Sequence, residues 1–370
     1  MQSEFSVGRV KVNAGKTVII AEAGVNHLKD ISLAERLIAT AAKAGADIIK
    51  FQTYSADGLV VKESPRFWDW EGEKVLGGTQ HDSYSPLATP ELEFTADLKG
   101  LCDKYEIEFM STPFDEETLG VLESLDTPAY KIASGDITNF ILLDAVAATG
   151  KPIFLSTGGS TAAEVDTAVK RLKQKDASAL CVMHCSLSYP TRMQDAHLLA
   201  ISALSEQFPG IPIGLSDHTI GPFIPALSVG LGCVAIEKHF TVDKGLPDSA
   251  DHWLSIDGEE LRQMVEYCRI AEAAMGHKSK SLSKAEEPAR ANARRSLVAA
   301  SDIEAGAVIT RDMLVAKRPA TGISPIFLDE VIGRKISVSR SEGEILMPND
   351  FSDDASFKRI YPEAMKLGPV

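Results

Sequence analysis

Short apolar runs alternate with longer amphipathic segments between Thr17 and about Gly276. The short runs have the length and composition of buried strands, and in the longer segments apolar residues recur at helical spacing. Eight strand–helix units over about 260 residues match a (β/α)8 barrel, so an α/β TIM barrel is the predicted fold. The predicted strands are Val18–Ala21, Ile48–Phe51, Ile107–Met110, Ala129–Ile132, Pro152–Leu155, Ala179–Met183, Pro212–Leu215 and Cys233–Ile236.

An open, doubly wound sheet is the competing α/β fold. Such a sheet normally carries a glycine-rich phosphate loop directly after its first strand. Here the first strand is followed by Glu22-Ala23-Gly24-Val25-Asn26-His27, which lacks that spacing of glycines. The barrel is therefore the favoured interpretation.

Polar residues lie at or just after the end of every predicted strand. In a barrel all these ends face one side, which is where barrel enzymes carry their catalytic residues. A run of eight polar strand ends therefore predicts an active site. The polar residues, strand by strand, are Glu22 and Asn26; Lys50 and Gln52; Ser111 and Thr112; Lys131, Ser134 and Asp136; Ser156 and Thr157; His184, Ser186 and Tyr189; Ser216, Asp217 and His218; and Glu237, Lys238 and His239.

Two of these clusters suggest a metal site. His218 and His239 each follow a short apolar strand, and a helix-like segment joins the two strands. If the strands are parallel neighbours, the imidazoles emerge side by side and two nitrogens can share one divalent cation. A single histidine in such a place is more often a hydrogen-bonded structural residue, and we assign no metal to His27 or His184.

Beyond the barrel the pattern changes. We predict a barrel domain at 1–277, a charged linker at 278–294, a small, mostly β domain at 295–352 and a tail at 353–370. Within the barrel domain, the long connection between Val61 and Pro90 is predicted to lack secondary structure, as expected of a lid or an oligomer contact. It contains Phe67-Trp68-Asp69-Trp70.

Composition narrows the function classes. The net charge of −14 argues against a nucleic-acid binder, so an anionic substrate would need a local cationic pocket. No apolar run is long enough for a membrane span and no signal peptide is evident, so we expect a cytoplasmic protein. Five cysteines, an odd number, indicate buried thiols rather than disulfides.

Together the motifs resemble those of the sialic acid synthase family, whose members condense phosphoenolpyruvate with an amino sugar. The resemblance covers roughly residues 17–350, and its C-terminal part resembles the SAF, or antifreeze-like, domain of that family. The matching segments are Ala21 to His27, Lys50 to Thr53, Ser111 to Asp115, Tyr130 to Asp136, Leu155 to Gly158, His184 to Thr191, Leu215 to Thr219, Glu237 to Thr241 and Lys317 to Pro319.

The resemblance implies roles for individual residues. His218 and His239 would hold a divalent metal, Mn²⁺ or Mg²⁺. Lys50, Thr112, Lys131, Ser134, Ser156 and Ser216 would surround phosphoenolpyruvate, and Glu22, Gln52, Asp136, Tyr189 and Asp251 would face the sugar. Arg318, on the small domain, would reach the barrel of a second subunit in a domain-swapped homodimer.

The residue chemistry agrees with this reaction. Phosphoenolpyruvate carries about three negative charges, which Lys50 and Lys131 can balance in an otherwise acidic protein. A bound metal would polarise the sugar aldehyde, and Glu22, Lys131 and Asp136 are our candidates for catalysis, with Glu22 moving protons. Candidate acceptors are N-acetylmannosamine, its 6-phosphate and a diacetamido-trideoxy hexose. Leu187 replaces an asparagine that some family members place near the sugar.

Two other functions remain open at this stage. One is a barrel aldolase or isomerase that uses the same metal without phosphoenolpyruvate. The other is a non-catalytic interaction protein that binds through its antifreeze-like module. The ring of polar strand ends, with its lysines, favours an enzyme over a scaffold.

Overall fold

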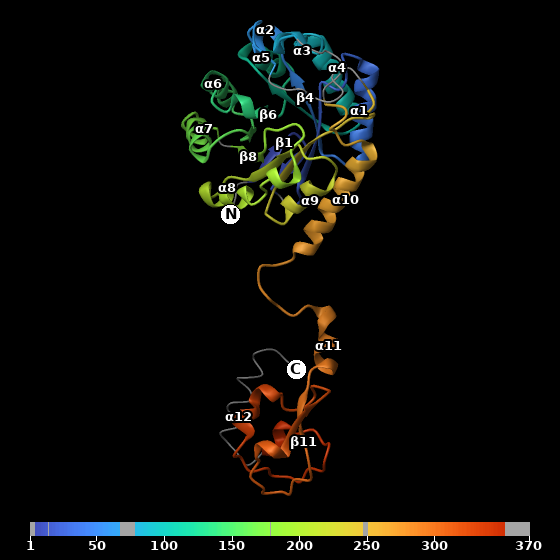
Figure 1. The fold of residues 1–370 in the computed structure, drawn as a ribbon, viewed down its shortest axis with the longest axis vertical. Coiled ribbons are helices and arrows are strands. Elements are labelled where there is room, and N and C mark those ends of the chain that lie inside the picture. Colours follow the sequence, from blue (N-terminus) through green and yellow to red (C-terminus); the bar gives the residue numbers. More distant parts are fainter. Residues whose placement is uncertain (1–3, 14, 67–77, 178, 247–250, 352–370) are drawn as a thin grey trace. The chain divides into compact units, whose positions relative to one another are not determined.

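The computed structural model describes residues 4–13, 15–66, 78–177, 179–246 and 251–351. The chain divides into two compact units, Met1–Gly276 and His277–Val370 (Figure 1). The first unit is a closed barrel of eight parallel strands in chain order, in which the last strand pairs with the first, so the predicted TIM barrel is confirmed. Its strands are β3 (Val18–Gly24), β4 (Ile48–Thr53), β5 (Glu108–Pro113), β6 (Tyr130–Ile132), β7 (Ile153–Ser156), β8 (Leu180–Cys185), β9 (Ile213–Asp217) and β10 (Ala235–His239).

Helices surround the barrel and cover its outer face. Most begin at a side-chain cap: Asp30, Asp115, Asn139, Thr161 and Asp257 each accept a hydrogen bond from an amide of the first turn. Among the described residues, no helix is both long and apolar enough to cross a membrane. The surrounding helices are α1 (Ile31–Ala44), α4 (Leu92–Lys104), α5 (Glu116–Ser124), α6 (Phe140–Ala148), α7 (Ala162–Gln174), α8 (Ala200–Gln207), α9 (Phe223–Val229) and α10 (Gly258–Met275).

Several strands continue past the apolar run that predicts them. β4 extends to Thr53, β9 to Asp217 and β10 to His239. Side chains alternate along a strand, so the polar residues at these ends can point into the barrel without breaking the ladder. Apolar periodicity alone therefore ends these strands too early.

An N-terminal hairpin that we did not predict closes the other end of the barrel. Its strands β1 (Phe5–Val7) and β2 (Val10–Val12) pair antiparallel. Val7 and Val12 are fully buried in the cluster formed by residues at the amino ends of the barrel strands. The barrel interior is thus apolar at this end, and its polar residues collect at the carboxyl end.

The connection after β4 contains two short helices, α2 (Ala56–Leu59) and α3 (Gln80–Tyr84). The prediction of no secondary structure between Val61 and Pro90 was wrong at α3, where Thr79 and Asp82 form a reciprocal cap. The aromatic run Phe67–Trp70 lies outside the described residues.

The second unit is a small domain with its own core. Strands β11 (Ser296–Ala299) and β12 (Leu314–Lys317) pair antiparallel, and isolated bridges extend the pairing, for example between Val298 and Ile345. The remaining helices are α11 (Glu287–Ala293), inside the predicted linker, and α12 (Leu328–Val331). Leu297, Ile309, Ile323 and Leu346 lie in the core. The predicted tail, residues 353–370, lies outside the described part.

Candidate active site at the carboxyl ends of the barrel strands

Side chains from all eight barrel strands, or from the residues just after them, line one cavity at the carboxyl end. It contains eleven of the fourteen residues to which we gave roles from the sequence. Those eleven are Glu22, Lys50, Gln52, Thr112, Lys131, Ser134, Ser156, Tyr189, Ser216, His218 and His239, and the other described lining residues are Phe114, Ala133, Cys185 and Glu237.

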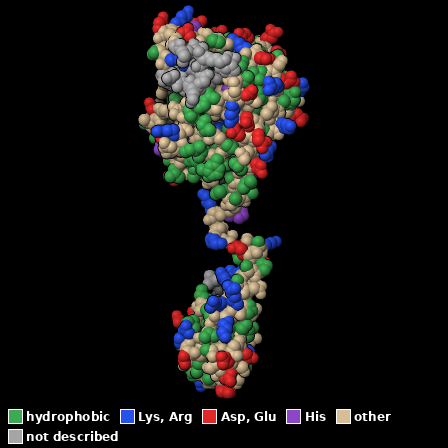
Figure 2. All heavy atoms as spheres, turned by 45° about the vertical axis from the view of Figure 1, so that its right-hand side comes forward, with side chains coloured by type: hydrophobic (Ala, Val, Ile, Leu, Met, Phe, Trp, Pro, Cys, Tyr) green, Lys and Arg blue, Asp and Glu red, His purple; other side chains and the backbone are tan. Residues whose placement is uncertain are grey.

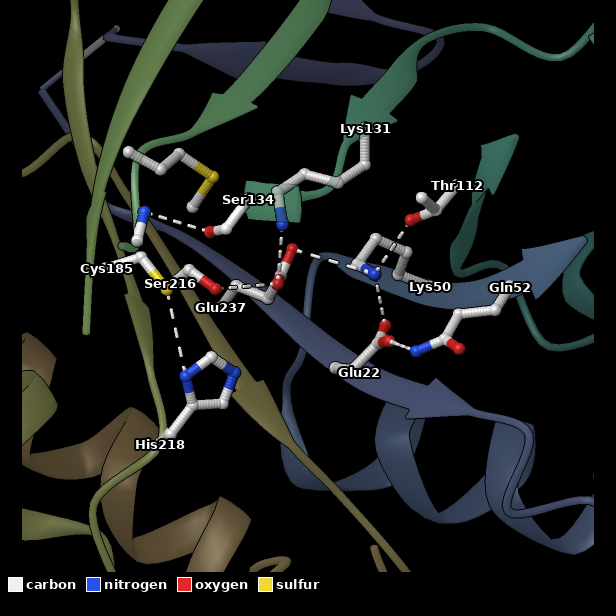
Figure 3. Close-up of polar contacts among 12 residues, drawn as sticks. Glu22, Lys50, Gln52, Thr112, Lys131, Ser134, Cys185, Ser216, His218 and Glu237 are labelled. Atoms are coloured by element: carbon white, nitrogen blue, oxygen red, sulfur yellow. Dashed lines mark hydrogen bonds and ion pairs between the residues drawn. The ribbon is translucent and has the colours of Figure 1, made fainter. Parts of the chain in front are cut away.

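The first ion pair in the cavity joins neighbouring strands. Lys50 Nζ lies 2.6 Å from Glu22 Oε2 and donates to Thr112 Oγ1 at 3.1 Å. The amide of Gln52 donates to the other oxygen of Glu22 at 2.9 Å (Figure 3). Both charged side chains are almost completely buried, so the pair stands in a medium that strengthens its electrostatic interactions.

The second ion pair crosses the barrel. Lys131 Nζ, on β6, donates to Glu237 Oε1 on β10 at 2.8 Å, and Ser216 Oγ donates to the same oxygen at 2.9 Å. Lys50 Nζ lies 3.9 Å from the second oxygen of Glu237 (Figure 3). Glu237 therefore links both lysines.

Glu237 is a site residue to which we gave no role from the sequence. It lies two positions before His239 on the same strand, so the two side chains share one face. This two-residue spacing is the feature of the sequence that could have identified Glu237 as a site residue.

The two carboxyl groups have different electrostatic surroundings. Burial, with the nearby charge of Glu237, raises the pKa of Glu22 above its usual value even though Lys50 opposes the shift. Burial acts on Glu237 in the same direction, but Lys131 and Lys50 outweigh it and lower its pKa. Glu237 is therefore held as a carboxylate, whereas Glu22, with its raised pKa, is the carboxyl group better suited to take up and release a proton.

Hydroxyl and amide groups complete this side of the cavity. The Ser156 hydroxyl is buried and has no hydrogen-bond partner among the described residues. Ser134 Oγ accepts from the Gly158 amide at 2.9 Å, and a Cβ on Gly158 would lie 2.8 Å from this oxygen. Because a buried hydroxyl without a partner costs free energy, Ser156 points to a polar ligand.

The two histidines predicted to bind metal lie together. Their ring centroids are 5.2 Å apart, and Tyr189 packs 4.1 Å from the His218 ring. His218 Nδ1 lies 3.0 Å from Ser186 O, and a hydrogen bond donated to this carbonyl leaves Nε2 with its lone pair. Burial and the His218 ring lower the pKa of His239 and favour its neutral form.

These imidazoles fit a divalent cation. No group of three or more His, Cys, Asp or Glu side chains with metal-binding geometry occurs in the described part of the chain, so a cation here would be held by the two imidazoles. Such a cation would keep positions for water and substrate oxygens, as catalytic metals do.

Three predicted residues do not line the cavity. Asp136 lies on the turn after β6 and accepts from Asn139 at 3.2 Å, and burial raises its pKa. Asp251 lies beside one of the two histidines, with Oδ2 3.5 Å from His239 Nδ1. Arg318 is an exposed residue of the second unit, just after β12.

His27 and His184, to which we assigned no metal, have structural partners. The His27 ring packs against Phe51 and Phe94 in the layer between strands and helices. His184 Nε2 lies 2.8 Å from Ala196 O. Neither residue lines the cavity.

Comparison with known proteins finds matches along most of the chain. The NeuB family model matches residues 37–280 and the SAF domain model matches 294–352. An N,N'-diacetyllegionaminic acid synthase of Legionella pneumophila is 39% identical over 89% of this chain and 93% of its own length. A pseudaminic acid synthase of Helicobacter pylori is 35% identical over 86% of this chain and 93% of its own length.

A solved structure gives the same result. The N-acetylneuraminic acid synthetase of Leptospira borgpetersenii, crystallised with citrate, is 35% identical with a TM-score of 0.69 over 78% of this chain and 95% of that one. With the barrel, the second unit and the family models all in agreement, this chain belongs to the NeuB family.

Proposed function

We propose that this protein condenses phosphoenolpyruvate with the open-chain form of an N-acetylmannosamine-like amino sugar to give a nonulosonic acid and phosphate. The observation that carries the proposal is the pair of buried lysines, Lys50 and Lys131, that line the cavity beside two imidazoles. The synthase relatives support the reaction type, and their names cover legionaminic, pseudaminic and sialic acids.

The lysine side of the cavity suits phosphoenolpyruvate. Its phosphate and carboxylate would bind between Lys50 and Lys131, with Thr112, Ser134, Ser156 and Ser216 as hydroxyl donors. Glu22 and Glu237 balance the ammonium groups, which keeps two buried lysines charged before the substrate arrives. The hydroxyl of Ser156 is the donor that this substrate would satisfy.

His218 and His239 would hold the divalent metal, Mn²⁺ or Mg²⁺. When bound there, the metal supplies Lewis-acid polarisation of the aldehyde oxygen of the sugar. The sugar would lie on the same side, in reach of Gln52 and Tyr189, and Asp136 and Asp251 are the further candidates for its hydroxyl groups.

Glu22 would move protons between the two substrates. The methylene carbon of phosphoenolpyruvate forms a bond to the aldehyde carbon, and water then adds to the cationic C2. Glu22 accepts one proton of that water and returns it to the former aldehyde oxygen, which becomes a hydroxyl. The tetrahedral intermediate then loses phosphate by cleavage of the bond between C2 and the bridging oxygen, as the C2 hydroxyl becomes the ketone and its proton leaves with the phosphate. The raised pKa of Glu22 suits this exchange, since the group must both take and return a proton.

We also propose a domain-swapped homodimer in which Arg318 completes the partner's site. An exposed apolar face supports self-association of the barrel: Phe223, Leu227, Ile270 and Met275 project from α9 and α10, where hydrophobic side chains gather (Figure 2). Arg318 is a guanidinium on the second unit, and guanidinium is well suited to bind phosphate or carboxylate.

Mixing two inactive variants tests the swap. A His218→Ala chain keeps Arg318, and an Arg318→Ala chain keeps an intact barrel. In a swapped dimer the mixed species contains one complete site, so mixing with subunit exchange restores activity. No recovery in a verified mixed dimer contradicts the swap.

A substrate panel tests the reaction itself. Candidate amino sugars are offered with phosphoenolpyruvate and Mn²⁺, and released phosphate and product mass are measured with and without a chelator. We expect phosphate release only when phosphoenolpyruvate, a sugar aldehyde and metal are all present. Turnover of a sugar without phosphoenolpyruvate would indicate an aldolase or isomerase instead.

A further inference from the structure

A buried ion pair lies behind the two imidazoles, on the outer face of the barrel. Lys238 Nζ is 2.5 Å from Asp217 Oδ2, and the side chains are only 1% and 4% exposed. Side chains alternate along a strand, so these two residues point away from the cavity that His239 and His218 line. Ile236 and Leu215, two positions earlier, pack in the layer between strands and helices and mark this outward direction.

The pair joins β9 and β10 at the position just before the imidazoles. Lys238 and Asp217 are direct neighbours in the parallel register, and they are the last registered pair between these two strands. The next residue along each strand is a histidine, His239 on one and His218 on the other. A contact that fixes the strands here also fixes the origins of the two rings.

Lys238 holds the turn that follows His218 as well. Its ammonium donates to Thr219 O and lies 3.4 Å from Thr219 Oγ1. Thr219 in turn donates from its hydroxyl to Asp217 Oδ2 at 2.8 Å and from its amide to Oδ1 at 3.3 Å. The residues on both sides of His218 are therefore bound to one ammonium group.

Burying this ion pair carries a free-energy cost, which suggests that it serves a purpose that apolar residues cannot serve. Burial of a lysine and an aspartate removes both from water, and apolar residues of similar size often stabilise a core as well or better. The same layer is filled by residues such as Ile236 and Leu215 at the adjacent outward positions. The ion pair differs from them in that its geometry is directional.

We infer that Lys238 and Asp217 are positioning residues whose ion pair sets the separation and direction of His218 and His239, so that one divalent cation binds both rings. The inference rests on the metal site proposed above and adds two residues that do not touch it. Outer partners of metal ligands commonly change metal affinity by about 10- to 100-fold when they are replaced.

Mn²⁺ affinity of the substrate-free protein tests the inference, measured from the electron paramagnetic resonance signal of free Mn²⁺. We expect Lys238→Met to raise the Kd for Mn²⁺ by about 10- to 100-fold, and Asp217→Asn to raise it less, because Lys238 keeps its bonds to Thr219. The matched control is Asp47→Asn. Asp47 accepts from the Ile19 amide at 2.9 Å and pairs with Arg269 at the opposite end of the barrel strands.

The outcomes separate this inference from the metal site itself. The control should keep the Kd of the unsubstituted protein even if its thermal stability falls. If Lys238→Met fails to fold, Asp217→Asn decides. Unchanged affinity in the folded positioning variants, or an equal loss in the control, overturns the inference alone. Failure of the unsubstituted protein to bind Mn²⁺ overturns the metal site and the inference with it.

Discussion

His27 provides a quantitative test that separates a structural histidine from the proposed ligands. The ring is fully buried against Phe51 and Phe94, and its Nε2 has no hydrogen-bond partner among the described residues. Burial, with a smaller contribution from the charge of Lys29, lowers its pKa from 6.5 to about 4. His27 therefore stays neutral in the folded protein while the unfolded chain takes up a proton.

This difference makes stability depend on pH. The contribution of His27 to the free energy of unfolding is fully present above pH 6.5. It is lost as the pH falls from 6.5 to about 4, because the unfolded state binds more protons than the folded state between these values. One pKa unit corresponds to about 1.4 kcal/mol, so the full loss is about 3.4 kcal/mol. Between pH 7.5 and 5.0 the same relation gives a loss of about 2 kcal/mol.

The assay compares urea unfolding of the unsubstituted protein and His27→Phe at several pH values. All three tryptophans, Trp68, Trp70 and Trp253, belong to the first unit, so fluorescence follows the barrel. Between pH 7.5 and 5.0 the free energy of unfolding should fall by about 2 kcal/mol more in the unsubstituted protein than in the variant, because the other titrating groups are common to both. Mn²⁺ affinity should not change. Parallel pH profiles would refute the reasoning.

Three further predictions concern the cavity. Ser156→Ala should raise the KM for phosphoenolpyruvate by about 10-fold or more, since a hydrogen bond to a charged ligand contributes about 1.5–3 kcal/mol. The urea midpoint of unfolding should stay constant. An unchanged KM would mean that Ser156 does not bind this substrate. Glu22→Gln should lower kcat by about 10²- to 10⁴-fold and abolish the rise of kcat with pH that ionisation of Glu22 produces; retention of that limb would assign it to another group. Lys50→Met leaves the buried carboxylate of Glu22 without its ion-pair partner and should destabilise the barrel by about 3–5 kcal/mol. Adding Glu22→Gln should partly restore the stability in the same unfolding assay. If the double variant is no more stable, the two residues are not coupled.

Much of the fold follows from the sequence because the barrel repeats one simple pattern. Each buried strand appears as an apolar run, and parallel strands that close into a barrel bring their carboxyl ends together. Lys50 on β4 and Lys131 on β6 could therefore be placed near each other without knowledge of any contact. The hairpin of β1 and β2 was missed because strands of three residues carry too little periodicity.

Details that depend on which face a residue takes were harder to predict. Glu237 and Lys238 are adjacent polar residues after the same apolar run, yet one lies in the cavity and the other behind it. Only the alternation of faces along β10 separates them: it puts Glu237 on the face of His239, and a shift of one residue would exchange their roles. Arg318 illustrates a different limit, since strand periodicity within one chain specifies no contact between two chains.

The most direct test of the central claim uses phosphoenolpyruvate labelled with ¹⁸O at the bridging oxygen, together with an accepted amino sugar and Mn²⁺. The account predicts that the ¹⁸O leaves in the released phosphate, because the C–O bond is the one that breaks. Unlabelled phosphate, with the ¹⁸O retained in the sugar acid, would contradict it.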